Sequence, residues 1–148
     1  MFKRVLVAIV GLMLSCSMAY AASKADAQQM VEKAATYLKE NGKDKFIAEV
    51  NKKDGQFSKG DLYVYVTDLN YNMLAHPVNP QLIGKNNVAE PDADGKMYRK
   101  EIVDIAKTKG NGWIDYKAKN PTSGKVEEKM ANVLKQDDVI IVAGVYKQ

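Results

Sequence analysis

The sequence is poor in the residues that build cross-links and metal centres. Among its 148 residues there is one cysteine, Cys16, and one histidine, His76. A disulfide needs two cysteines, and a closed zinc site needs four ligands drawn mainly from cysteine and histidine. If a leader containing Cys16 is removed, disulfides, cysteine-ligated zinc and thiol catalysis are all excluded. The fold must then rest on its core alone.

A strong excess of one charge is also missing. The chain has 22 Lys and Arg residues against 18 Asp and Glu residues, which gives a net charge of +4. The two signs are interleaved, which argues against a nucleic-acid partner. The sequence has no glycine-rich phosphate loop, no zinc motif and no paired carboxylates at a diagnostic spacing. We therefore expect no cofactor, and the residues give no positive indication of an enzyme.

The first 21 residues have the pattern of a secretory signal peptide. Lys3 and Arg4 precede a short apolar run, residues 5–14, and Ala19-Tyr20-Ala21 has the small-x-small form of a cleavage site. The run is too short to serve comfortably as a membrane anchor. Leu14-Ser15-Cys16 loosely resembles a lipoprotein processing site, which is the less favoured alternative. We expect cleavage after Ala21 and a periplasmic or secreted product.

The remaining residues, 22–148, suit one domain with a normal core. Ser23-Lys-Ala-Asp26 predicts a capping box at the start of a helix that Asn41-Gly42 ends. Asp44 is expected to cap a second, shorter helix, which Asp54-Gly55 closes. The first helix carries one apolar stripe of the kind that docks on a sheet, formed by Ala27, Met30, Val31, Ala34, Tyr37 and Leu38.

A β-hairpin is predicted in the middle of the chain. Residues 62–66 are β-branched and aromatic, as in a strand, and residues 73–76 form the returning strand. Asp68-x-Asn70-x-Asn72 between them resembles the start of a calcium loop, but Met73 and Asn79 stand where such a loop needs glycine and glutamate. A turn is the favoured interpretation. Pro77 and Pro80 then end the pairing.

The second half of the chain predicts one helix and three strands. The helix should run from about Gly95 to Lys109, capped by Asp92 or Asp94, and the strands should cover residues 113–119, 126–135 and 139–146. Short turns join these strands, as in antiparallel pairs. The fold class is therefore α+β with an antiparallel sheet.

Two polar side chains have open interpretations. His76 either bonds the backbone of the proline-containing loop that follows it or contacts a ligand, and no nucleophile in the sequence forms an obvious triad with it. Lys129, which follows two glutamates, is either solvated or an inward-facing cation that holds a carboxylate.

Trp113 and Tyr116 are three positions apart, so on a regular strand they face opposite sides. We expect Trp113 to be substantially buried.

An ordered set of short motifs resembles the single Cache domain of bacterial extracytoplasmic sensors. The motifs are AHP, GKN, DGK, GxGW, NPTSGK and GVY, and the match runs from about Ala25 to Tyr146. The resemblance implies a PAS-like sheet of about five strands behind a long N-terminal helix, with a ligand between the sheet and its covering loops. The implied ligand is a short organic acid, such as acetate, propionate, pyruvate or lactate.

The side chains expected to bind that acid are His76, Lys129, Tyr65 and Tyr116 as donors, with Trp113 and Tyr98 as walls. The chain departs from the family at Asn132, where members often have an aromatic residue. Members also usually continue into a transmembrane helix and a kinase or chemotaxis module, whereas this sequence ends at Gln148. The resemblance therefore implies a separate membrane partner, either a sensor kinase or a chemoreceptor.

Three hypotheses remain open at this level. The first is a ligand-binding sensor domain. The second is a ligand-free interaction module that docks, or forms a homodimer, through its N-terminal helix. The third is a hydrolase that uses His76.

Overall fold

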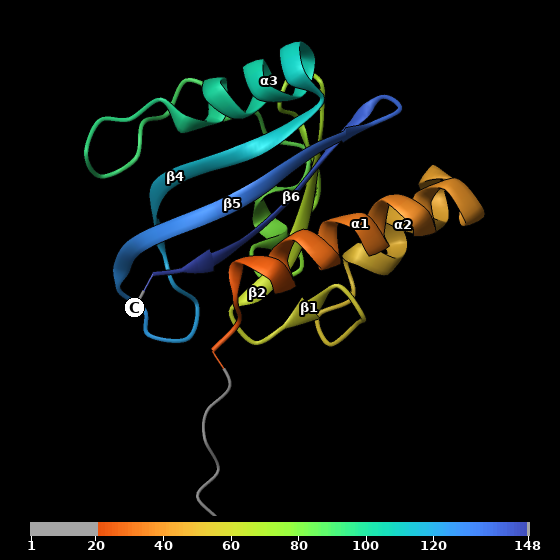
Figure 1. The fold of residues 1–148 in the computed structure, drawn as a ribbon, viewed down its shortest axis with the longest axis horizontal. Helices are drawn as coiled ribbons and strands as arrows, with labels where there is room; N and C mark the ends of the chain where they lie inside the picture. The colour runs from red at the N-terminus through yellow and green to blue at the C-terminus, as the bar shows by residue number, and fades with distance from the viewer. Residues whose placement is uncertain (1–20, 148) are drawn as a thin grey trace, which may run out of the picture.

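An antiparallel sheet divides the protein into two layers (Figure 1). The computed structural model describes residues 21–147, so the predicted signal peptide lies outside the described residues except for Ala21. The strands follow the order β1-β2-β6-β5-β4, and β3 pairs with β2. Their bounds are Ser58–Lys59 (β1), Leu62–Asp68 (β2), Met73–Ala75 (β3), Asn111–Lys119 (β4), Val126–Gln136 (β5) and Val139–Tyr146 (β6).

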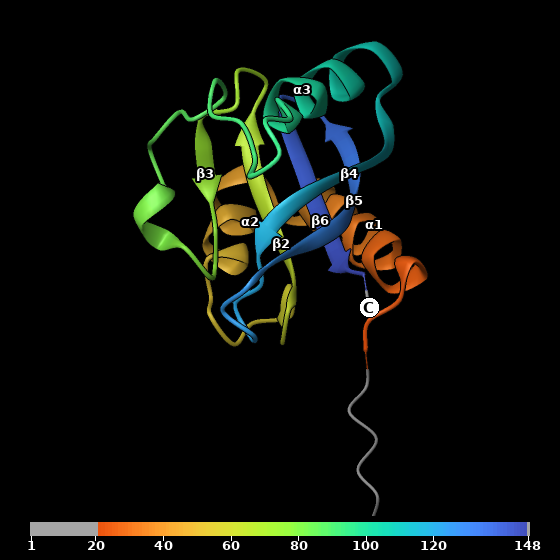
Figure 2. The same cartoon turned by 90° about the vertical axis from the view of Figure 1, so that its left-hand side faces the viewer.

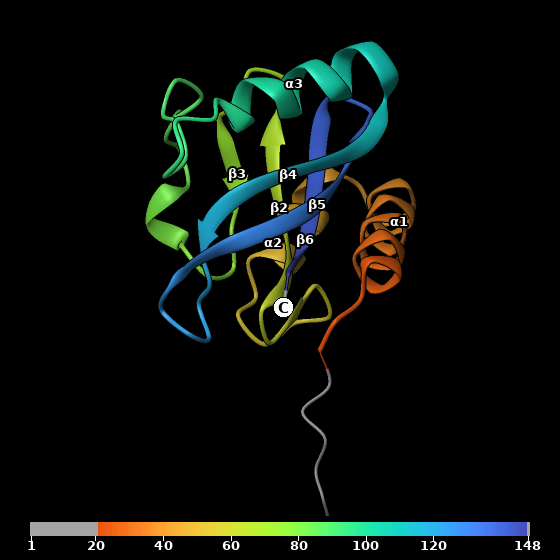
Figure 3. The same ribbon diagram turned by 60° about the vertical axis from the view of Figure 1, so that its left-hand side comes forward.

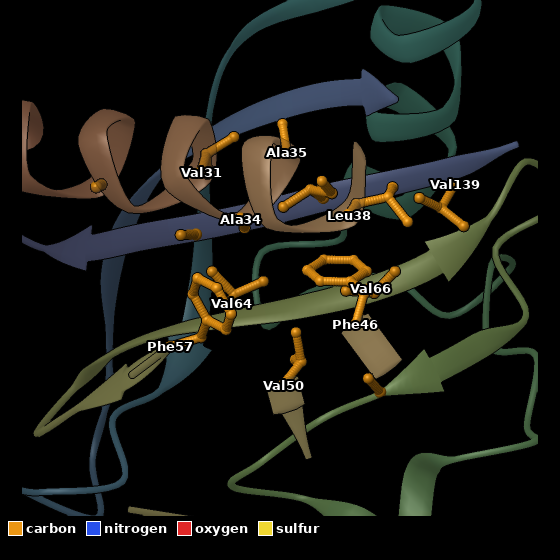
Figure 4. Packing of buried hydrophobic residues seen from close by; sticks show 14 of the residues in the cluster. Val31, Ala34, Ala35, Leu38, Phe46, Val50, Phe57, Val64, Val66 and Val139 are labelled. Carbon is orange, nitrogen blue, oxygen red and sulfur yellow. The ribbon is translucent and has the colours of Figure 1, made fainter. Parts of the chain in front are cut away.

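Helix α1, Lys24–Asn41, packs along one face of this sheet. Its predicted capping box is confirmed, because the Ser23 hydroxyl accepts the Asp26 N–H at 3.2 Å and the Asp26 carboxylate accepts the Ser23 N–H at 2.7 Å. The predicted apolar stripe is also confirmed. Figure 4 shows Val31, Ala34 and Leu38 of α1 in the packed apolar cluster on this face of the sheet.

Helix α2, Lys43–Val50, continues the same layer after a sharp change of direction at Gly42. Gly42 has a φ of 84°, which favours glycine. No side chain caps α2, and Asp44 lies in its first turn, so the predicted cap at Asp44 is wrong. The helix ends at Val50 rather than at Asp54-Gly55. Phe46 and Val50 are fully buried against the sheet.

The β2–β3 hairpin confirms the turn interpretation of residues 68–72. The Asp68 carboxylate accepts the backbone N–H groups of Asn70 and Asn72, at 2.9 and 2.8 Å, and the side-chain amide of Asn72 at 2.7 Å. The hydrogen bonds of the turn therefore use both oxygens of the Asp68 carboxylate. Tyr71 takes a positive φ of 68° in the turn, and its ring is buried under the layer that covers the other face of the sheet.

Helix α3, Tyr98–Lys109, lies on that other face with the loops before it (Figures 2 and 3). It starts later than predicted and has no side-chain cap. Asp92 does not cap it, because its carboxylate accepts the N–H groups of Asp94, Lys96 and Lys117. The bond to Lys117 joins the loop to the edge strand β4. Within the described residues, no helix has the length and apolarity needed to cross a membrane.

Strand pleating gives the two faces different compositions. In β2, Leu62, Val64 and Val66 enter the core under α1 and α2, whereas Tyr63 and Tyr65 enter the core under α3. In β5 and β6 the residues alternate in the same way. The predicted antiparallel sheet with a long N-terminal helix is confirmed, with β1 as a short additional strand.

Candidate ligand-binding site

A cavity of about 280 Å³ lies between the tyrosine-bearing face of the sheet and its covering layer. Five of the six side chains expected from the sequence line it: Tyr65, His76, Tyr98, Tyr116 and Lys129. They come from β2, the loop after β3, α3, β4 and β5, so segments far apart in the sequence meet at one place.

Lys129 is the most unusual residue of the cavity. Its side chain is only 1% exposed, and no carboxylate of the described residues lies within 4.0 Å of its ammonium. The ammonium lies 3.3 Å from the Tyr63 hydroxyl and over the rings of Tyr63 and Tyr146, at 4.4 and 5.1 Å from their centroids. The solvated-lysine interpretation is therefore wrong, and Lys129 is an inward-facing cation.

Gly144 makes room for the Lys129 side chain. A Cβ atom added at Gly144 would lie 2.8 Å from Cε of Lys129 and 2.8 Å from the carbonyl oxygen of Met130. Both distances are shorter than real Cβ atoms allow. Glycine at this position therefore leaves the space in which the Lys129 side chain passes over β6 into the cavity. This gives a physical reason for the glycine in the GVY motif.

His76 both supports its loop and lines the cavity. Its Nδ1 accepts the backbone N–H of Asn79 at 2.9 Å, and its own backbone N–H donates to the Asn51 side chain at 2.9 Å. Burial, followed by the charge of Lys129, lowers the pKa of His76 to about 3. The ring is therefore neutral near pH 7. Because Nδ1 accepts a hydrogen bond, the proton is on Nε2.

Tyrosines form the walls between these groups. The rings of Tyr98 and Tyr116 stack with centroids 3.9 Å apart, and the His76 ring stacks on Tyr65 with centroids 5.5 Å apart. The Tyr71 hydroxyl donates to the Tyr65 hydroxyl at 3.3 Å, and that of Tyr65 lies 3.5 Å from that of Tyr116. Burial raises the pKa values of Tyr65 and Tyr116, so both hydroxyls keep their protons.

Trp113 is the one expected wall residue that the structure places elsewhere. It is only partly buried and packs against the core under α1, with the Lys24 ammonium 4.4 Å from its ring centroid. The reason is strand pleating, since Tyr116 points to the cavity and a residue three positions away points to the opposite face. Asn132 lies opposite Trp113 in the β4–β5 pairing and donates to the Gly112 carbonyl, so the departure from the family pattern there does not touch the cavity.

Four further residues of the site were not in the set of side chains expected to bind the acid: Tyr63, Tyr71, Arg99 and Tyr146. Tyr63 shares a strand face with Tyr65, and this period of two is visible in the sequence. Tyr146 lies opposite Lys129 because of the tight turn between β5 and β6, so counting back from that turn identifies the pair. Arg99 reaches the cavity because α3 packs over the sheet, and Tyr71 reaches it from the turn after β2. No pattern in the sequence predicts either position.

The arrangement defines a class of protein, a PAS-like domain with a ligand-sized cavity on the face of the sheet opposite its long N-terminal helix. The family model of single Cache domain 2 matches residues 5–148. The chain belongs to this family.

Similar solved structures have the same fold. One is a Cache chemosensory domain described for its carboxylic acid recognition, with a TM-score of 0.74 and 24% identity over 84% of this chain and 92% of that one. Another is a methyl-accepting chemotaxis protein from Vibrio parahaemolyticus, with a TM-score of 0.69 and 22% identity over 83% and 87%. A third is the periplasmic sensor domain of a chemotaxis protein, with a TM-score of 0.65 and 24% identity over 82% and 88%.

Proposed function

We propose that this protein is an extracytoplasmic sensor domain that binds a short carboxylate in the cavity around Lys129. The observation that carries the proposal is the buried ammonium itself. An isolated charge is costly to bury unless a partner of opposite sign or several hydrogen bonds compensate it. The described residues offer Lys129 one tyrosine hydroxyl and two aromatic faces. A bound carboxylate supplies the missing negative charge.

The groups beside Lys129 can also donate hydrogen bonds to a bound carboxylate. A carboxylate accepts hydrogen bonds only, and the Nε2–H of neutral His76 and the protonated Tyr65 and Tyr116 hydroxyls are donors. Hydrogen bonds to an ionised group are about twice as strong as neutral ones. The small volume of the cavity favours an acid of a few carbon atoms. The carboxylic acid recognition described for a Cache chemosensory domain of the same fold supports this ligand class.

The hydrolase hypothesis has little support. Among the described residues that line the cavity there is no serine, threonine or cysteine, and the Asp92 carboxylate is occupied by three backbone N–H groups. A histidine whose pKa is lowered to about 3 is also a weak general base near pH 7. A sensor domain, the function implied by the family, fits these groups better.

The interaction-module hypothesis also fits less well. The apolar stripe of α1 is used up in packing on the sheet, and the outward side of the helix is polar. Among the described residues the exposed large hydrophobic side chains are Ile83 and Val126, at 40% and 56% exposure, and both lie outside α1. A docking helix would need an apolar outward face.

The cellular setting completes the proposal. Removal of residues 1–21 as a signal peptide, with lipidation at Cys16 as the less favoured alternative, would place the domain in the periplasm or outside the cell. There it would pass its signal to a separate membrane partner, a sensor kinase or chemoreceptor. Intact mass of exported protein tests the first step, because a mature chain that begins at Ala22 lacks the lipid adduct that Cys16 would carry.

Titration calorimetry with a panel of two- to four-carbon acids tests the ligand. Wild type is expected to bind at least one, and Lys129→Met should weaken it by roughly 30-fold to several thousand-fold, the usual loss for one charged partner of a desolvated pair. Methionine keeps much of the aliphatic stem, so packing is nearly preserved. Equal affinities in both proteins would remove Lys129 from the site. Absence of binding to wild type would favour the interaction module.

A further inference from the structure

Arg99 gives the cavity a second cation. The residue lies in the first turn of α3 and lines the cavity from the side of the covering layer, whereas Lys129 enters from the sheet. The Arg99 guanidinium lies over the Tyr98 ring, whereas the Lys129 ammonium lies over the rings of Tyr63 and Tyr146. Positive charge is therefore supplied from two sides.

The guanidinium is held in place by groups that do not neutralise it. Its Nη1 donates to the Glu90 carbonyl at 2.8 Å, and its carbon lies 4.4 Å from the Tyr98 ring centroid. Burial raises the pKa of Tyr71, and the nearby Arg99 charge acts against that rise. No carboxylate of residues 21–147 lies within 4.0 Å of Arg99.

The other charges around the cavity do not change this balance. Lys117 is paired with Asp94 at 3.0 Å, and Lys119 is exposed to solvent. Among the described residues, Asp92 is the one carboxylate that lines the cavity, and its oxygens accept the N–H groups of three backbone amides. Within residues 21–147, Lys129 and Arg99 thus have no acidic partner within 4.0 Å.

We infer that the preferred ligand is a short acid with two anionic ends, a dicarboxylate, and that Arg99 is the residue that binds its second end. The inference rests on the proposed function, since it assigns Lys129 to the first carboxylate. A monocarboxylate of the same length leaves Arg99 with an apolar methyl group, whereas a second carboxylate accepts charge-assisted hydrogen bonds from the guanidinium. The Tyr65 and Tyr116 hydroxyls line the same cavity.

The test compares acids of equal length that differ in one carboxylate. Malonate is paired with propionate, succinate with butyrate and glutarate with valerate, and each is titrated into wild type, Arg99→Met and Lys100→Met above pH 6. Lys100 is the matched control, because it is exposed, is absent from the cavity wall and loses the same charge. Thermal unfolding confirms that each variant is folded, and Arg99→Lys separates the charge from the forked geometry.

We expect the best dicarboxylate to bind wild type at least about ten-fold more tightly than its monocarboxylate partner, the size of one charge-assisted interaction. Arg99→Met should remove that preference, because it weakens the dicarboxylate more than its monocarboxylate partner, while Lys100→Met changes neither affinity. If monocarboxylates bind through Lys129 and are preferred, or if Arg99→Met has no effect on selectivity, the inference is wrong and the proposed function stands. If no acid of either kind binds, the proposed function fails with it.

Discussion

The two faces of the sheet are built from the same strands and differ in what they bury. The face under α1 and α2 is lined with valine, leucine, isoleucine, alanine and phenylalanine, and it packs closely (Figure 4). The face under α3 carries five buried tyrosines of the sheet and its turn, together with His76 and Lys129, around a cavity. One face can thus provide stability while the other keeps a polar site, because pleating sends neighbouring residues to opposite sides.

The largest expected effect comes from breaking the apolar face. Phe46 is fully buried and its ring makes an edge contact with Phe57, with centroids 6.1 Å apart. Phe46→Ala should lower the free energy of unfolding by about 3–5 kcal/mol, because it leaves a cavity in a close-packed core. Denaturant unfolding measures this loss.

The contrasting change on the other face is Lys129→Met. It should leave the stability of the ligand-free protein unchanged or raise it, since replacing a buried charge by an apolar side chain of similar shape is often favourable. A large loss of stability in this variant would show that the tyrosine-bearing face also holds the fold together and would remove the distinction between the faces.

Gly144→Ala tests whether the space at Gly144 lets the Lys129 side chain pass from β5 over β6 into the cavity. The new Cβ would overlap Lys129 Cε and the Met130 carbonyl, and such overpacking typically costs about 1–3 kcal/mol. Affinity for the acid should fall as well, because the ammonium is displaced. Thermal unfolding and calorimetry report the two effects, and wild-type values in both would contradict this role for Gly144.

The pH dependence of stability should report on His76. Its pKa is about 3 in the folded protein and about 6.5 in an unfolded chain. Below pH 6.5 the unfolded state binds a proton that the folded state does not, so stability falls as the pH falls toward 3, with a slope of up to about 1.4 kcal/mol per pH unit. Urea unfolding between pH 8 and 5 measures this slope.

His76→Asn is the control for that slope. Its side-chain oxygen can replace Nδ1 as the acceptor for the Asn79 N–H, and it does not titrate. The variant should therefore lose the contribution of one proton to the slope while its loop stays in place. An unchanged slope would show that other groups cause the pH dependence.

Of the two aromatic substitutions, Trp113→Ala is expected to have the smaller effect. The residue is partly buried at the edge of the apolar face and is not in the cavity wall, so we expect a loss of about 1–2 kcal/mol, below that of a buried aromatic residue. Affinity for the acid should not change. Weaker binding in a stably folded Trp113→Ala protein would return this residue to the site.

Most of the helices and strands, and the faces they bury, could be predicted from local sequence patterns. The alternation in residues 62–66, the stripe of α1 and the turn residues of 68–72 depend on local chemistry and on periods of two and 3.6, which can be counted along the chain. The same period separates Trp113 from Tyr116, although the sequence alone did not say which of them faced the cavity.

Which polar groups meet, and which of them are buried, could not be predicted in this way. Lys129 follows two glutamates, and its local sequence suits a solvated lysine. Its burial comes from strands β4 and β6 on either side, from the gap at Gly144 and from the covering layer. Arg99 reaches the same cavity because α3 packs over the sheet. Burial and charge pairing are properties of contacts between distant segments, so a site made of such contacts exists only once the chain has folded.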